Sequence, residues 1–107
     1  MRIRKGMMLD FMKLGHGLIV NINKKFESTV GLHPYAYEQA YTQDRVILTN
    51  KYDVDVLIEG KLLPVHIVMH YEWEGDLCRI EWKELRDSPW APSGLAELLW
   101  TPPEESA

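Results

Sequence analysis

Two histidines four residues apart, His66 and His70, are the side chains of this 107-residue sequence with the clearest potential for chemistry. On a helix this spacing would put both imidazoles on one face, as a zinc site requires. Here the surrounding residues Val65, Ile67, Val68 and Met69 favour a strand. Four residues of strand span roughly 13 Å, too far for both histidines to bind one metal ion. Cross-strand pairing of each histidine with a carboxylate is therefore the favoured interpretation.

Carboxylates are frequent around these histidines, and a metal site that joins one histidine to Glu72, Glu81 or His33 remains an alternative. Paired carboxylates catalyse acid–base reactions when one of them lies in an apolar pocket. Arg79 and Lys83 interleave with the acids instead, which is typical of a solvated, charge-balanced sheet face. The sequence contains no phosphate-binding loop and no nucleophile motif. We therefore predict no catalytic residue, no cofactor and no resident metal. The acidic cluster near the histidines consists of Glu72, Glu74, Asp76, Glu81, Glu84 and Asp87.

Aromatic side chains are numerous for a chain of this size, with four tryptophans and five tyrosines. Trp90 lies between prolines on an expected loop, and Trp100 ends the last expected element. Exposed tryptophan and tyrosine are enriched at protein interfaces. The alternative is that both tryptophans cap the core. We predict Trp90, Trp100, Tyr37 and Tyr41 as partner-binding residues.

Charge is distributed unevenly along the chain. Residues 1–25 contain six basic residues and one acid, whereas the remainder contains six basic and fifteen acidic residues. The basic segment, with Arg2, Arg4 and Lys5 at its start, either contacts an acidic partner or lies against the acidic body of the protein itself. Nucleic-acid binding through this segment is an alternative function.

The length predicts one domain over residues 1–100, followed by a flexible tail at 101–107. The single cysteine excludes an intramolecular disulfide. No run of eighteen apolar residues is present, so we expect no transmembrane helix and a cytoplasmic location.

Period-two alternation is the dominant pattern of the middle of the chain and predicts a β-meander over residues 45–87. A turn at Gly75-Asp76 would pair His70 with Glu81 and Met69 with Trp82. A second turn at residues 59–61 would place His66 beside Asp53 or Asp55.

The flanks of the meander show a different, helical spacing of apolar residues. This spacing predicts helices over residues 6–14, 34–43 and 95–100. Alternation of Leu18, Val20 and Ile22 with their neighbours predicts a strand at 18–23, and the alternative is one long helix that runs through Gly15 and Gly17. The predicted fold is α+β: a mainly antiparallel sheet of four to five strands with short helices packed on one face.

Function follows from size, aromatic content and the absence of a catalytic constellation. We predict a small non-enzymatic protein-binding module that forms a homodimer. In general style, though in no motif, it resembles phage or mobile-element accessory proteins that inhibit or modulate a host protein complex. Besides nucleic-acid binding, a small metal-dependent enzyme using His66 or His70 with nearby carboxylates is a further alternative.

Overall fold

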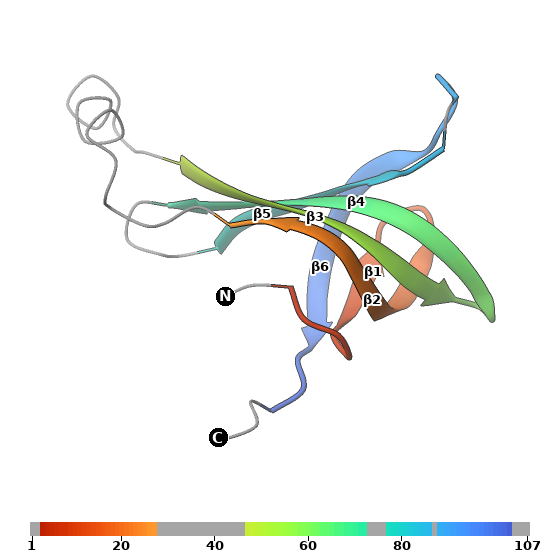
Figure 1. Cartoon of the computed structure of the whole chain (residues 1–107), viewed down its shortest axis with the longest axis horizontal. Coiled ribbons are helices and arrows are strands. Elements are labelled where there is room, and N and C mark those ends of the chain that lie inside the picture. The colour runs from red at the N-terminus through yellow and green to blue at the C-terminus, as the bar shows by residue number, and fades with distance from the viewer. Residues whose placement is uncertain (1–2, 28–46, 73–76, 87, 104–107) are drawn as a thin grey trace.

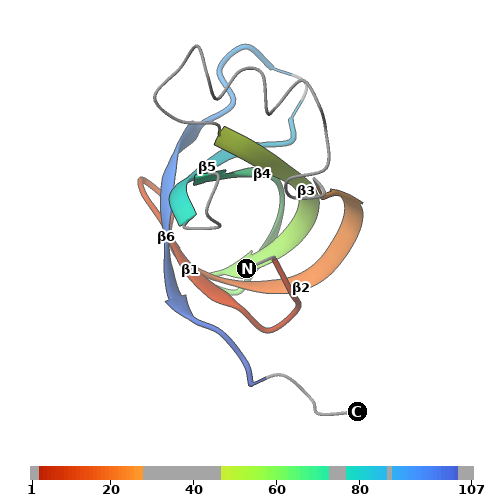
Figure 2. The ribbon, with the colours of Figure 1, turned by 90° about the vertical axis from the view of Figure 1, so that its left-hand side faces the viewer.

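The protein forms a closed barrel of six antiparallel strands in which each strand pairs with its neighbours in the sequence and the last pairs with the first (Figures 1 and 2). The computed structural model describes residues 3–27, 47–72, 77–86 and 88–103, and within these it leaves out the side chains of residues 47–48, 71–72 and 77–78. The strands are β1 (Met8–Phe11), β2 (Gly15–Phe26), β3 (Ile47–Ile58), β4 (Lys61–Glu72), β5 (Leu77–Glu84) and β6 (Ser93–Trp100).

The core is the inside of the barrel, and the alternation of the middle strands is confirmed. Inward-facing side chains of β1 to β5 are buried, and those of β6 pack partly against them. Pairing of β1 with β6 closes the sheet, so the apolar faces of the strands share one dry interior. The buried residues are Ile3, Met7, Leu9, Phe11, Ile19, Tyr52, Val54, Val56, Ile58, Val65, Ile67, Met69, Ile80 and Trp82.

The predicted α+β class is wrong, because the described residues contain six strands and no helix. The segment predicted as a helix over residues 6–14 is strand β1 followed by a tight turn. Met7, Leu9 and Phe11 are fully buried, which is the period-two pattern of a strand. Lys13 has φ 80° and Gly15 has φ 112°, so a left-handed turn replaces the last turn of the expected helix.

The predicted helix over residues 95–100 is also wrong, because these residues belong to β6. Ala96 and Leu98 pack against the core, whereas Leu95 and Leu99 are exposed. Short apolar runs fit either period, and the backbone hydrogen bonds to β1 and β5 decide for the strand. The predicted strand at 18–23 lies within β2, while the helix predicted at 34–43 falls outside the described residues.

The turn between β3 and β4 is confirmed. Glu59 and Gly60 have φ values of 51° and 76°, as a two-residue type I′ turn requires. The resulting register pairs Asp53 with His66, one of the two predicted neighbours.

The predicted register between β4 and β5 is wrong by two residues. His70 lies opposite Arg79, and Ile67 lies opposite Trp82. A register shift between His70 and Tyr71 accommodates this pairing. Glu81 still reaches His70, but as a diagonal neighbour rather than a direct one. The predicted turn at residues 75–76 falls outside the described residues.

The two ends of the barrel differ. One end, called here the hairpin end, carries the β1–β2 turn, the β3–β4 turn and the β5–β6 loop, on the right of Figure 1. Toward the other end, Arg4 donates a hydrogen bond from Nη2 to the carbonyl oxygen of Pro102 at 2.7 Å. This contact ties the N-terminal segment to the residues that follow β6.

Gly17 marks where the barrel wall is tightest. A Cβ atom at this position would lie 2.4 Å from Val56 Cγ1, and 2.9 Å from both Ile58 Cγ1 and Phe11 Cε2. These side chains belong to the core, so they have little freedom to move away. Glycine is therefore required at this point of β2.

Candidate protein-binding surface

The middle of the outer face of β3, β4 and β5 carries a set of paired charges, called here the charged ladder: Asp53, His66, His70, Arg79 and Glu81. His66 Nδ1 donates to Asp53 Oδ1 at 2.6 Å. His70 Nε2 donates to Glu81 Oε2 at 2.9 Å, and Arg79 Nε approaches Glu81 Oε1 at 3.2 Å. The predicted pairing of each histidine with a carboxylate is confirmed.

Glu81 is the carboxylate with the most contacts in this ladder. The hydrogen bond from His70, assisted by the positive charge of Arg79, holds the pKa of Glu81 below its ordinary value of 4.5. The Glu81 side chain is 41% exposed, so solvent screens these interactions. A lowered pKa keeps this carboxylate ionised, which suits a structural ion pair better than an acid catalyst.

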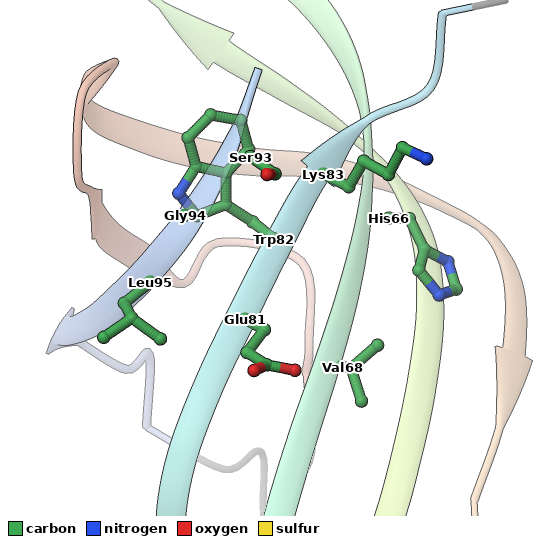
Figure 3. Close-up of a pocket in the computed structure, with 8 residues that line it drawn as sticks. All are labelled: His66, Val68, Glu81, Trp82, Lys83, Ser93, Gly94 and Leu95. Carbon is green, nitrogen blue, oxygen red and sulfur yellow. The ribbon is translucent and has the colours of Figure 1, made fainter. Parts of the chain in front are cut away.

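A shallow groove of about 450 Å³ lies on the outer face of β4, β5 and β6 (Figure 3). It is bordered by Val68 and Leu95 as well as by polar groups. Ser93 supplies a hydroxyl at one side, while His66, hydrogen-bonded to Asp53, lies at the other. These two residues lie on strands separated by β5, so roughly 10 Å divides them. A serine nucleophile needs its histidine within about 3 Å, so the groove does not form a catalytic triad.

The two histidines are also too far apart to bind one metal ion together. His66 and His70 lie four residues apart on β4, and each points to a different carboxylate. Within the described ranges, no three His, Cys, Asp or Glu side chains converge on a point where a metal ion could be held.

A second outward-facing group, called here the apolar band, runs around the hairpin end: Met12, Leu57, Leu62, Leu85, Trp90 and Leu95. These are six of the nine large hydrophobic side chains that are exposed in the described structure. Leu57 and Leu62 are cross-strand neighbours, and the Leu85 amide donates to the Pro64 carbonyl. The amide of Met12 donates to the Leu95 carbonyl, which joins β1 to β6 at the same end. Most of the exposed large hydrophobic side chains therefore lie toward the hairpin end, and Leu95 at the margin of the band lies opposite Glu81 of the charged ladder.

Trp90 is the most exposed of them, at 85% of its surface. The loop that carries it is held by its own hydrogen bonds. The Trp90 amide donates to Ser88 Oγ at 3.1 Å, and the Ala91 amide donates to the Ser88 carbonyl. At the end of the loop, the Glu84 amide donates to the Pro92 carbonyl at 3.0 Å. These bonds present the indole to solvent without a large ordering cost on binding.

The structure separates the partner-binding residues predicted from sequence. Trp90 lies at the hairpin end, whereas Trp100 lies at the opposite end of β6, about 25 Å of strand away. Arg4 contacts Pro102, near the Trp100 end. The remaining predicted residues are Lys5, which is exposed in the same N-terminal segment, and Arg2, Tyr37 and Tyr41, which lie outside the described residues.

Sequence reasoning missed five members of the apolar band: Met12, Leu57, Leu62, Leu85 and Leu95. A usable signal was present at Leu57, which follows Asp53 and Asp55 on the outward phase of the β3 alternation. An apolar residue on the phase that should face water indicates a contact surface. Met12 and Leu95 carried no such signal, because both had been assigned to helices.

Comparison with known proteins yields no match: no protein family model, no curated protein and no solved structure is similar to this chain. In the part of the chain that the structure describes, no helix is long and apolar enough to cross a membrane.

Proposed function

We propose that the protein is a non-catalytic module that binds a protein partner through the apolar band at the hairpin end. The observation that carries this proposal is the gathering of six exposed hydrophobic side chains at one end, with Trp90 held outward by a hydrogen-bonded loop. Large exposed apolar side chains that lie toward one end of a protein are typical of interaction sites, and tryptophan is among the residue types most enriched at binding hot spots.

The contrast with the charged ladder supports the same proposal. Polar groups that resemble catalytic ones, such as His66 with Asp53, already satisfy one another on the outer face. Among the described residues, Ser93 supplies the hydroxyl that borders the groove, and β5 separates it from His66. A module of this kind inhibits or modulates a complex by occupying a surface of one of its members. A cytoplasmic location and a homodimer, in which the partner is a second copy of the chain, belong to the proposal.

A matched pair of tryptophan variants tests the proposal. Trp90→Ala removes the most exposed member of the band, and Trp100→Ala removes an exposed tryptophan at the other end of β6. Sedimentation measures the self-association of wild type and of each variant. Immobilised wild type and variants are also compared for the proteins that they capture from a lysate of the cells that produce the chain. We expect Trp90→Ala to weaken association at least tenfold and Trp100→Ala to change it less than twofold.

Circular dichroism confirms that both variants are folded, as their exposure leads us to expect. The proposal is rejected if neither self-association nor any captured protein depends on Trp90. Equal losses in the two variants would also reject it, because the band would then not be the binding surface.

A further inference from the structure

Among the described residues, no strand lies beside the second half of β2 on the side away from β3. Strand β2 has twelve residues, whereas β1 has four and pairs only with residues 15–18. Gly6 and Met7 extend the pairing by one residue, through hydrogen bonds to Ile19. Ile3 then turns into the core, where it is 3% exposed. From Asn21 to Phe26, β2 pairs with β3, and no other described segment pairs with its opposite edge.

The shape of the sheet shows the same feature. In Figure 1, β2 to β5 continue beyond the region where β1 and β6 close the barrel. An unpaired edge exposes backbone N–H and C=O groups that readily accept another strand. The open position continues the path of β1, so an added strand would complete the wall.

Residues 21–26 of β2 include two lysines and no acid, while Asp53 and Asp55 lie opposite Lys24 and Asn21 on β3 and Glu27 follows the segment. Lys24 and Lys25 are exposed, and neither forms a salt bridge with any described residue. Asn21 and Asn23 flank them, and Phe26 is 63% exposed at the end of the strand. The charge of this edge is opposite to that of the protein as a whole, whose net charge is −4.

A second copy of the chain is a poor occupant of this edge. Antiparallel pairing of two β2 edges would bring Lys24 and Lys25 close to the same lysines of the second copy, and like charges in close cross-strand positions are destabilising. Register shifts between Ile19 and Asn21 and between Ile22 and Lys24 also twist the edge. Lysines and bulges are the features that keep natural edge strands from pairing with each other.

An acidic strand faces no such repulsion. We propose that the edge of β2 from Asn21 to Phe26 binds an extended acidic segment of another protein as an added strand. Backbone hydrogen bonds supply affinity in this mode, and side chains supply selectivity. Six residues of edge accommodate about 20 Å of extended chain. This site is distinct from the apolar band, so either surface can fail experimentally without the other.

The test uses the full chain and a fluorescent peptide of about eight residues in which glutamate alternates with valine. A peptide with lysine in place of glutamate and a single-stranded oligonucleotide serve as comparison ligands. We expect the acidic peptide to bind and to slow amide hydrogen exchange at residues 21–26. Double charge reversal with Lys24→Glu and Lys25→Glu should weaken binding at least tenfold.

Two controls separate the edge from general charge attraction. Lys13→Glu with Lys61→Glu makes the same change of charge at the hairpin end, and we expect it to leave binding within twofold. Trp90→Ala should also bind the acidic peptide normally, since it affects only the apolar band. The proposal is overturned if the peptide does not bind, if it binds without protecting residues 21–26, or if the two double reversals weaken it equally. Preferential binding of the oligonucleotide would overturn it in favour of a nucleic-acid site.

Discussion

The outward side chains of β3, β4 and β5 form two regions of opposite character along the same strands. In the middle of the strands, Asp53, His66, His70 and Glu81 make short hydrogen bonds to one another. Toward the hairpin end the same outward phase carries apolar residues such as Leu62, which is 59% exposed. Both regions lie on one rigid wall, so they differ in side-chain chemistry rather than in backbone geometry. The first region is satisfied within the chain, whereas the second leaves apolar side chains in contact with water.

The two regions also differ in how their interactions contribute to the free energy of folding. Exposed ion pairs and hydrogen bonds contribute about 0.2–1 kcal/mol each, so the charged ladder makes a modest contribution to folding. Burial of exposed apolar surface lowers the free energy by about 25 cal/mol per Å². The apolar band therefore contributes little to folding, and under the proposed function its burial would drive association.

The largest effect on the free energy of unfolding is expected from a substitution that disturbs the packing of the barrel core. Gly17→Ala places a methyl group among the core side chains of Val56, Ile58 and Phe11. We expect a loss of about 3 kcal/mol in the free energy of unfolding, because overfilled cores relax only at the cost of strain. Urea denaturation measures this loss. His16→Ala, at the exposed neighbouring position, is the control. Equal stability of the two variants would show that the core side chains around residue 17 move aside at little cost.

The regular β-pattern of the middle strands was predictable because burial on one face imposes period two on Val54, Val56, Val65 and Ile67. The class of the flanks was not predictable, since the apolar residues of 6–14 and 95–100 satisfy both periods. Only pairing between segments far apart in sequence distinguishes them: Phe11 lies beside Ala96 in the closed barrel. Closure of the barrel depends on contacts between distant segments, and the local spacing of apolar residues does not predict it.

The candidate site was predictable to a similarly limited degree. Trp90 was identified because prolines flank it, which keeps a large aromatic side chain on a loop. Its neighbours in the apolar band come from five different strands, turns or loops, and their placement depends on barrel closure. The register of β4 and β5 was mispredicted because direct pairing and diagonal contact both bring Glu81 to His70.

A matched substitution on β4 sharpens the comparison of the two regions. Leu62→Thr and His66→Thr change two outward residues of one strand to the same side chain. We expect His66→Thr to lower the free energy of unfolding by about 1 kcal/mol, since Asp53 loses its hydrogen-bond donor. Leu62→Thr should stay within about 0.5 kcal/mol of wild type, because its side chain is largely exposed. Thermal and urea denaturation measure both values, and a reversed order would break the comparison.

The smallest effect is the pH dependence contributed by Glu81. Its pKa in the folded protein lies below the ordinary value of 4.5, so the stability it contributes is complete above that value and is lost as the pH falls through the folded pKa. The stability difference between wild type and Glu81→Gln should therefore be a few tenths of a kcal/mol near pH 6 and shrink below about pH 4.5. Glu97→Gln is the control, because Glu97 faces another acid, Asp10, across β1 and β6. A difference for Glu81→Gln that grows on acidification would show that protonated Glu81 is the better partner of His70 and Arg79, and the charged ladder would then not depend on charge.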